Sequence, residues 1–504
     1  MKRIFRIVFI LIAFVACDEG FEELNENPNA ATSLEPGPKL TATILRVSGD
    51  RYENWRANLI YSSTMIQHIA TTAGYWSGDK YTYNAQYSGA WFERAYNDQV
   101  KGIEDLRSQL SAEGNSYPEE MLSIVRILRV HIYSKVSDIY GDVPYSEAGR
   151  GFTDGIFRPK YDPQSEIYAD MLNELEEATA ALGSGPSQFG SADIIFGGDQ
   201  AKWKKWGNSL MLRLALRMIK VDPAAAQEWA TKAITGGVMT SNDDIAYVVH
   251  TDGPDGINRN GNGQAFSADN NPRLSETFVS FLENDPRLNV YGSLPDVEAN
   301  AGIDRFAPEN QRGLPNGLDG ATLPTVTGED DLNSFTEPNR NYMTSESAPM
   351  FFQTYAEVEF MLAESAVRWG IAGGNAQAHY NAGVTAAMKY LELYSPEASI
   401  SDGAVSAYLS ENPFNANNAL EQINTQYWAA TFLNDVESWA NWRRTGFPQL
   451  TPVNYPGNVT NGTIPRRLRY FEREQTSNAA NYQEVIGRQG PDVLTTRMWW
   501  DVQE

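Results

Sequence analysis

A short polar segment at residues 74–84 carries four aromatic rings, a pattern suited to binding flat ligands that bear hydroxyl groups. The rings are Tyr75, Trp76, Tyr81 and Tyr83, and Asp79 and Asn84 add hydrogen-bonding groups among them. Aromatic faces stack on sugar rings, and nearby polar side chains can bind hydroxyls. The rings follow neither a helical nor a strand period, so we expect at least one of them to stay exposed. The alternative is that they pin the loop to the scaffold.

A second set of candidate ligand contacts lies in a long excursion at about 236–348, which is rich in Gly, Asn, Asp and Pro. Within it, the pattern predicts a helix at 275–283 alone. So long a stretch without regular elements is usually functional in a compact protein. The candidates are Arg259, Asn260, Asn270 and Tyr291, with Asn258, Asn262, Asp269 and Asn271 as further polar side chains. Such residues also build ordinary turns, which is the competing interpretation.

Two glutamates raise the question of catalysis. Glu357 and Glu364 lie seven residues apart on a predicted helix and could form an acid/base pair for glycoside hydrolysis. The alternative is ion pairing between packed helices, because Arg213 and Arg217 share one helix face and Arg368 follows Glu364 by four residues. We favour ion pairing, and therefore expect both glutamates to be structural.

Composition narrows the function classes further. The chain has 504 residues and a formal net charge of −24, with 64 acidic against 40 basic residues. This balance argues against a nucleic-acid-binding protein, which would show a basic surface. With one cysteine and four histidines, the chain has no internal disulfide framework and few thiolate or imidazole ligands for a metal. We therefore expect no metal site and no cofactor.

The N-terminus predicts export and a lipid anchor. Lys2, Arg3 and Arg6 precede an apolar stretch at 7–16, which is too short to span a bilayer and indicates a signal peptide at 1–16. Cys17, directly after this stretch, resembles the acylated cysteine of bacterial lipoproteins, although it could be coincidental. Several acyl chains anchor a protein stably. Residues 17–36 are polar and acidic, so we expect them to form a lipidated tether. The protein would then be held to a membrane by its lipid alone.

Helical periodicity predicts a mostly α protein. The predicted helices are 51–72, 88–110, 119–140, 165–182, 200–220, 223–235, 355–369, 376–394 and 416–433. Successive helix pairs suggest stacked helical hairpins like those of tetratricopeptide repeats, although no clean 34-residue repeat is visible. The excursion would then sit on this scaffold as a cap or binding face.

Several stretches spread over nearly the whole chain resemble one protein family. They are residues 21–29, 133–148, 202–217, 355–364, 442–448, 464–470 and 497–501. Each stretch alone is a weak signal, but their order along the chain makes the match specific. They resemble the SusD/RagB-like nutrient-binding lipoproteins of the Bacteroidota outer membrane, in the branch with an Asn-Pro-Asn stretch at 27–29 after the lipid anchor.

The resemblance implies one SusD-like domain at 37–504, with a tetratricopeptide-like helical-hairpin scaffold and a large loop-rich ligand-binding region. It also implies a protein of the outer membrane that faces the cell exterior and captures glycans or peptides. Because members of the family have no catalytic residues, the resemblance implies no enzymatic activity. The implied partner is a SusC-like TonB-dependent transporter barrel, to which the ligand is delivered. Three alternatives stay open: a surface glycoside hydrolase or lyase, a peptide-binding member of the family, and a structural partner of the barrel without its own ligand.

Overall fold

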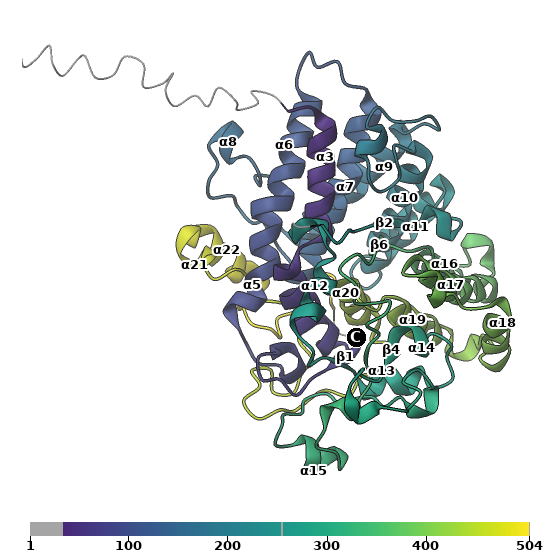
Figure 1. Cartoon of the computed structure of the whole chain (residues 1–504). Coiled ribbons are helices and arrows are strands. Elements are labelled where there is room, and N and C mark those ends of the chain that lie inside the picture. Colours follow the sequence, from purple (N-terminus) through teal and green to yellow (C-terminus); the bar gives the residue numbers. More distant parts are fainter. Residues whose placement is uncertain (1–33, 254–255, 503–504) are drawn as a thin grey trace, which may run out of the picture.

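The computed structural model describes residues 34–253 and 256–502 and shows a mostly α-helical protein, as predicted (Figure 1). The longer helices are α3 (Pro36–Ser48), α5 (Ala85–Arg94), α6 (Lys101–Ser111), α7 (Glu119–Tyr140), α9 (Gln164–Ala181), α10 (Gln200–Arg217), α11 (Pro223–Gly236), α16 (Tyr355–Trp369), α17 (Ala376–Lys389), α18 (Asp402–Glu411), α19 (Ala419–Ala430), α20 (Asp435–Thr445) and α22 (Ala479–Gln489). The predicted signal peptide, Cys17 and nearly all of the tether lie outside the described residues.

Shorter elements connect these helices. They include α4 (Arg51–Glu53), the π-helical η1 (Asn54–Ser63) and η3 (Ala95–Val100), the 3₁₀ turn η2 (Ser77–Lys80), α8 (Gly151–Asp154), α12 (Gly261–Ala268), α13 (Glu276–Phe281), α14 (Leu288–Tyr291), α15 (Leu323–Thr327) and α21 (Glu474–Ser477). Three antiparallel pairs of strands join β1 (Ile69–Ala70) to β3 (Arg273–Leu274), β2 (Ala246–Val248) to β6 (Met350–Gln353), and β4 (Gly292–Ser293) to β5 (Glu337–Pro338). The first two pairs attach the excursion to the rest of the fold.

Local signals explain where the central helices begin and end. Helix α7 starts after Pro118 with acidic residues in its first turn, and it stops at Gly141, whose φ of 86° suits glycine. Helix α16 starts with a capping box, in which the Thr354 side chain and Glu357 satisfy each other's backbone N–H groups. Both helices therefore have the bounds that the sequence predicts.

The helices pack in sequential pairs, as in a stack of helical hairpins. Helix α7 packs against α9, α9 against α10, and α10 against α11, while α16 packs against both α17 and α19. Figure 1 shows α3, α6 and α7 side by side, in agreement with their contacts. One large hydrophobic core runs through this scaffold and includes the fully buried Trp203, Trp206 and Trp439.

The excursion at 236–348 contains more regular structure than its composition suggests. Besides α13, it forms α12, α14 and α15, so the expectation of a helix at 275–283 alone is wrong. The sequence pattern did not predict helix α12 because its first turn contains two glycines, which have low helix propensity. A Cβ on Gly261 would lie 2.4 Å from Asn54 Nδ2, and one on Gly263 would lie 2.3 Å from the Ser345 carbonyl oxygen. Glycine permits this close packing.

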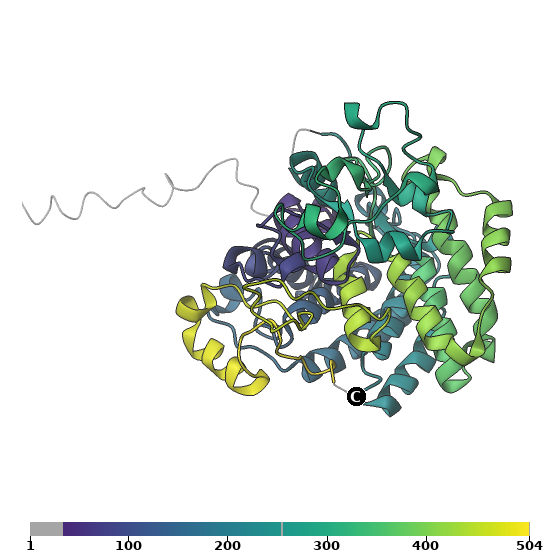
Figure 2. The same cartoon turned by 90° about the horizontal axis from the view of Figure 1, so that it is seen from below.

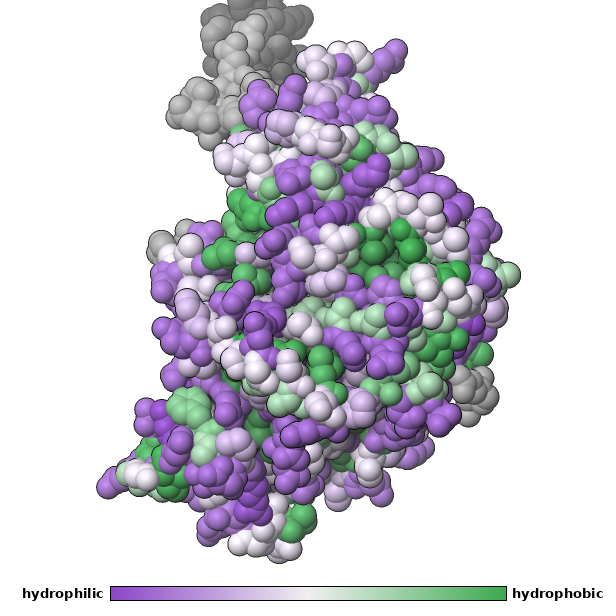
Figure 3. All heavy atoms as spheres, turned by 90° about the vertical axis from the view of Figure 1, so that its right-hand side faces the viewer, coloured by the Kyte–Doolittle hydropathy of each residue, from purple (hydrophilic) through white to green (hydrophobic). Residues whose placement is uncertain are grey.

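Segments distant in sequence surround the core on different sides. Figure 2 shows the green helices α16–α18 on one side, the yellow C-terminal segment on the opposite side, and the teal excursion along a third. On the face seen in Figure 3, hydrophilic residues predominate and hydrophobic residues form separate small patches. Among the helices within 34–253 and 256–502, none combines the length and apolar character that crossing a membrane requires.

Candidate functional site

Two aromatic side chains from separate segments form an exposed corner on the surface. Trp55 belongs to η1, and Tyr75 lies just before η2. Their ring centroids are 6.5 Å apart with an interplanar angle of 88°, an edge-to-face arrangement that aromatic pairs favour. Tyr75 is 41% exposed and Trp55 is partly exposed. The pair therefore presents ring surface to solvent, whereas most aromatic rings of the chain lie in the core.

The carboxylate of Asp269, in the segment after α12, holds this corner together. It is 5% exposed and accepts hydrogen bonds at Oδ2 from the Tyr75 hydroxyl at 2.5 Å and from Trp76 Nε1 at 2.9 Å. Its Oδ1 accepts from Asn271 Nδ2 at 2.7 Å. Partial burial and the hydrogen bond to Asp269 raise the pKa of Tyr75 to about 12, so its hydroxyl stays protonated at neutral pH. The exposed ring is thus fixed in one orientation.

The rest of the aromatic loop is a structural element. Trp76 and Tyr81 are both 0% exposed. The expectation that rings without a helical or strand period would escape burial is therefore wrong for these two residues. The covering groups come from remote parts of the chain. Asn316 Nδ2 donates to Asp79 Oδ1 at 2.6 Å, and the backbone N–H of Val453 donates to the Tyr81 hydroxyl at 3.2 Å. Trp76, Asp79 and Tyr81 therefore attach the loop to the scaffold, which was the alternative interpretation of this segment.

The last two loop candidates also have structural partners. The guanidinium of Arg469 lies over the partly exposed Tyr83 ring, with its carbon 4.1 Å from the ring centroid. Asn84 caps α5 by accepting a hydrogen bond from the backbone N–H of Tyr87 at 3.1 Å. Neither residue takes part in the hydrogen bonds around Asp269, so the exposed corner uses Tyr75 alone from the predicted loop set, with Trp76 behind it.

The excursion candidates are dispersed. Asn260 is buried, caps α12 and donates to the carbonyl oxygens of residues 348 and 349. Tyr291 is 0% exposed and stacks on Phe278, so its predicted accessibility to a ligand is wrong for this conformation. Arg259 forms an ion pair with Glu346 at 2.5 Å. Asn270 is exposed and directly follows Asp269, so it is the excursion candidate nearest in sequence to the corner.

The residue that sequence reasoning missed is Trp55. It falls within a predicted helix, where tryptophan is normally read as a core residue. Its polar neighbours Arg51, Asn54 and Arg56 offered a weak signal, although the apolar Leu59 lies one turn further along the same face. The Arg51 guanidinium carbon lies 5.9 Å from the centre of the Trp55 ring, which is partly buried against the core and partly exposed.

The two candidate catalytic glutamates are sealed inside the scaffold. Glu357 binds Arg213 at 2.6 Å, and Glu364 binds both Arg444 and Arg368 at 2.7 Å. Each glutamate is 1% exposed. Burial alone would raise the pKa of Glu364, but the two arginines lower it to about 2. The expected pairing with arginine is confirmed, and these carboxylates are not accessible to a substrate in this conformation.

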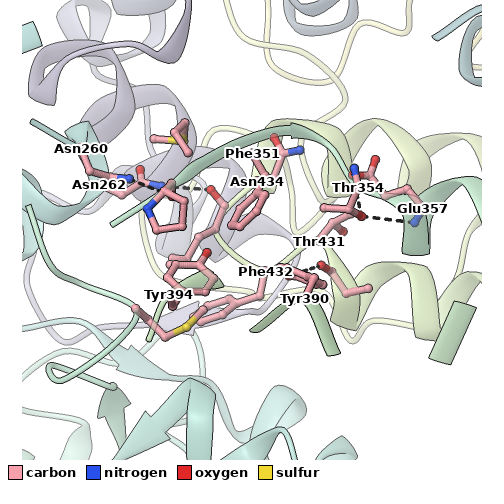
Figure 4. A pocket seen from close by; sticks show the side chains of 15 residues that line it. Asn260, Asn262, Phe351, Thr354, Glu357, Tyr390, Tyr394, Thr431, Phe432 and Asn434 are labelled. Carbon is pink, nitrogen blue, oxygen red and sulfur yellow. Dashed lines mark hydrogen bonds between the residues drawn. The ribbon is translucent and has the colours of Figure 1, made fainter. Parts of the chain in front are cut away.

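A small cavity marks the joint between the excursion and the helices. Figure 4 shows Asn260, which caps α12, and Asn262 from its first turn on one side, with Tyr390, Tyr394 and Phe432 from the helical scaffold around the same space. Its volume of about 20 Å³ has room for a single water molecule. It is therefore a packing defect at the joint. Within 34–253 and 256–502, no cluster of three or more His, Cys, Asp or Glu side chains is arranged to hold a metal ion.

Comparison with known proteins assigns the family. A SusD-like family model matches residues 28–471 and is described as "Starch-binding associating with outer membrane". No curated protein matches the chain. Among solved structures, one described as a chitin-binding protein is 32% identical, with a TM-score of 0.83 over 93% of this chain and 100% of that one.

Two further structures have the same fold. One described as Bacteroidetes AC2a SusD-like is 26% identical, with a TM-score of 0.80 over 93% of this chain and 100% of that one. A chitin-binding SusD homolog from Flavobacterium johnsoniae is 24% identical, with a TM-score of 0.77 over 93% of this chain and 99% of that one. The helical hairpins, the excursion and the family match lead to one conclusion: this chain belongs to the SusD-like family.

Proposed function

We propose that this protein captures oligosaccharides at the cell surface and delivers them to a TonB-dependent transporter barrel of the outer membrane. The observation that carries the binding part is the exposed Tyr75–Trp55 corner, held by Asp269. Membership of a family described as starch-binding and associated with the outer membrane supports it. The 32% identical relative described as a chitin-binding protein gives further support.

The corner suits a sugar for three physical reasons. Tyr75 and Trp55 offer ring faces for the apolar side of a pyranose. Asn271 places an amide beside them, 3.4 Å from the Tyr75 hydroxyl, which suits hydroxyl groups of a ligand. Asp269 already fixes the Tyr75 torsions in the free protein, so binding costs little side-chain entropy. A preorganised, exposed site of this kind fits a protein that retains its ligand and does not transform it.

The ligand class can be tested with the purified, unlipidated protein. Calorimetry against chitin oligosaccharides, starch oligosaccharides and a peptide mixture should show saturable binding of a glycan. Because of the relative described as chitin-binding, chitin oligosaccharides are the first choice. Products released by catalytic amounts of protein would instead favour the hydrolase or lyase. Saturable binding of peptides alone would move the protein to the peptide-binding class.

Membrane attachment through Cys17 is a separate part of the proposal. We expect the variant Cys17→Ala to leave the membrane fraction, because the acyl chains would supply the attachment. Fractionation followed by immunoblotting measures this, with wild type as the membrane-bound reference. A variant that stays in the membrane fraction after a high-salt wash would contradict lipid anchoring at this residue.

Delivery to a transporter predicts a stable partner. The wild-type protein, extracted in mild detergent, should co-purify with a TonB-dependent barrel. Recovery of the barrel together with a Tyr75→Ala variant would show that ligand binding and partner binding use different surfaces. Isolation of the wild-type protein without any barrel would contradict the delivery part and leave the glycan-binding part standing.

A further inference from the structure

A large cleft lies at the far end of the helical scaffold, among the ends of three helices and the C-terminal segment. It has a volume of about 690 Å³ and is bordered by the last turns of α16 and α20, the start of α19 and residues 466–502. Four arginines line it: Arg368, Arg443, Arg466 and Arg497. Among the lining residues that the structure describes, Glu421 is the one with a carboxylate. The lining is thus basic in a strongly acidic protein.

Each carboxylate that binds one of the exposed cleft arginines also binds a second arginine. Glu364 binds both Arg368 and the deeper Arg444, each at 2.7 Å. Asp501 binds both Arg466, at 2.7 Å, and Arg497, at 2.8 Å. Each carboxylate is therefore matched with two guanidinium groups, and positive charge remains in excess on the cleft side.

Arg443 adds to this excess. It is 2% exposed and donates to the backbone oxygens of Asp138 at 2.6 Å and Arg466 at 2.8 Å. Its guanidinium carbon lies 3.7 Å from the ring centroid of Trp439 and 4.9 Å from that of Trp500. In the described part of the chain, no carboxylate lies within ion-pair distance of Arg443. Burial lowers its pKa to about 9, as expected for a buried cation without a matching anion.

The partial charges of the helix ends change the positive electrostatic potential of the cleft without reversing its sign. The start of α19 lines the cleft, and its capping residue Asn418 makes no side-chain capping bond, so backbone N–H groups there add partial positive charge. The last turns of α16 and α20 add partial negative charge, roughly half a unit at each end. Because one positive and two negative ends meet here, their net effect is smaller than the guanidinium excess.

We propose that this cleft binds an organic anion about the size of a sugar ring, whose carboxylate or sulfate group is held by Arg368 and Arg497. The side chains of these two arginines are 27% and 37% exposed, so both can reach a ligand. Guanidinium groups bind such oxyanions through paired hydrogen bonds. The volume lies in the usual range for small-molecule sites and exceeds what a bare inorganic anion needs.

The test uses the double variant Arg368→Gln/Arg497→Gln and calorimetry at low ionic strength. The probes are glucuronate, inorganic sulfate and neutral glucose. We expect wild type to bind glucuronate more tightly than sulfate and to bind glucose much more weakly than either. The double variant should lose roughly tenfold or more in glucuronate affinity. Arg150→Gln is the matched control, because Arg150 is exposed, pairs with Asp154 and lies outside the cleft.

Several results would overturn the proposal. They are equal binding of glucose and glucuronate, no binding of any anion at millimolar concentration, or equal losses in the double variant and the Arg150 control. Sulfate binding as tight as glucuronate binding would refute the sugar-sized ligand and assign the site to a free inorganic anion. If the double variant melts early, Arg497→Gln alone serves, because Arg466 still pairs with Asp501. Tyr75→Ala should keep glucuronate binding, which separates this site from the glycan site.

Discussion

Asp269 at the surface corner and Glu364 in the helical scaffold are both buried carboxylates, but they support opposite tasks. Glu364 is 1% exposed and its partners are two guanidinium groups. Asp269 is 5% exposed, and its partners are neutral donors, one of which belongs to the 41% exposed Tyr75. The first arrangement fixes one helix against another. The second fixes an exposed ring for contact with something outside the protein.

The comparison shows that residue type does not identify the site. A glutamate pair in a helix looks like chemistry in the sequence, yet the folded chain surrounds it with arginines. A tryptophan and a tyrosine in unremarkable positions become accessible because the chain leaves them uncovered. Trp76 and Tyr75 sharpen the contrast, since these neighbours donate to the same oxygen of Asp269 and differ mainly in exposure.

The largest effect is expected for Trp76→Ala. Trp76 is fully buried, and removal of so large a side chain from a core typically costs about 3–5 kcal/mol of unfolding free energy. Denaturant titration of the variant against wild type measures this loss. A variant with wild-type stability would contradict the structural role of Trp76 and would return it to the set of ligand-contacting rings.

Glu364→Gln tests the other side of the comparison. Removing one partner of a buried ion pair leaves two arginines without their counter-charge, so we expect a loss of about 3 kcal/mol in unfolding free energy. Glycan affinity per folded molecule should stay at the wild-type level. Glu176→Gln is the control, because its pair with Lys232 is exposed and should contribute less than about 1 kcal/mol.

The same glutamate predicts a pH dependence. The folded pKa of Glu364 is about 2, below its ordinary value of 4.5, because the arginines favour the charged form. Its contribution to stability is therefore complete above about pH 4.5 and is lost as the pH falls toward 2. The stability difference between wild type and Glu364→Gln should shrink over this range. A difference independent of pH would show that the carboxylate charge is not what stabilises the helices.

How much the sequence could predict depends on how local the determining contacts were. The ends of α7 and α16 follow from proline, acidic residues, a capping box and glycine within a few positions, and they were predicted correctly. The burial of Tyr81 depends on Val453, 372 residues away, and that of Asp79 on Asn316. No local pattern contains such contacts. For the same reason, the meeting of Tyr75 with Asp269 could not be predicted from either segment alone.

A smaller effect is expected at the α16–α17 hairpin. The hydrogen bond to Glu359, at 2.6 Å, raises the pKa of His379 above its ordinary 6.5, although partial burial opposes this. The stabilising contribution is therefore complete below about pH 6.5 and is lost as the pH rises through the folded value. The stability advantage of wild type over His379→Gln should be less than about 1 kcal/mol and should decline between pH 6 and 9. An advantage that grows with pH would contradict the ion pair.

The central claim is that the exposed Tyr75–Trp55 corner binds the glycan, and Tyr75→Ala tests it most directly. With an oligosaccharide already shown to bind wild type, calorimetry should show a loss of about 1–2 kcal/mol, or roughly 5- to 30-fold in affinity. The melting temperature should stay close to that of wild type. Phe157→Ala, which removes an 81% exposed ring elsewhere, should leave the affinity unchanged. Wild-type affinity in Tyr75→Ala would contradict the account and place the glycan site on another surface.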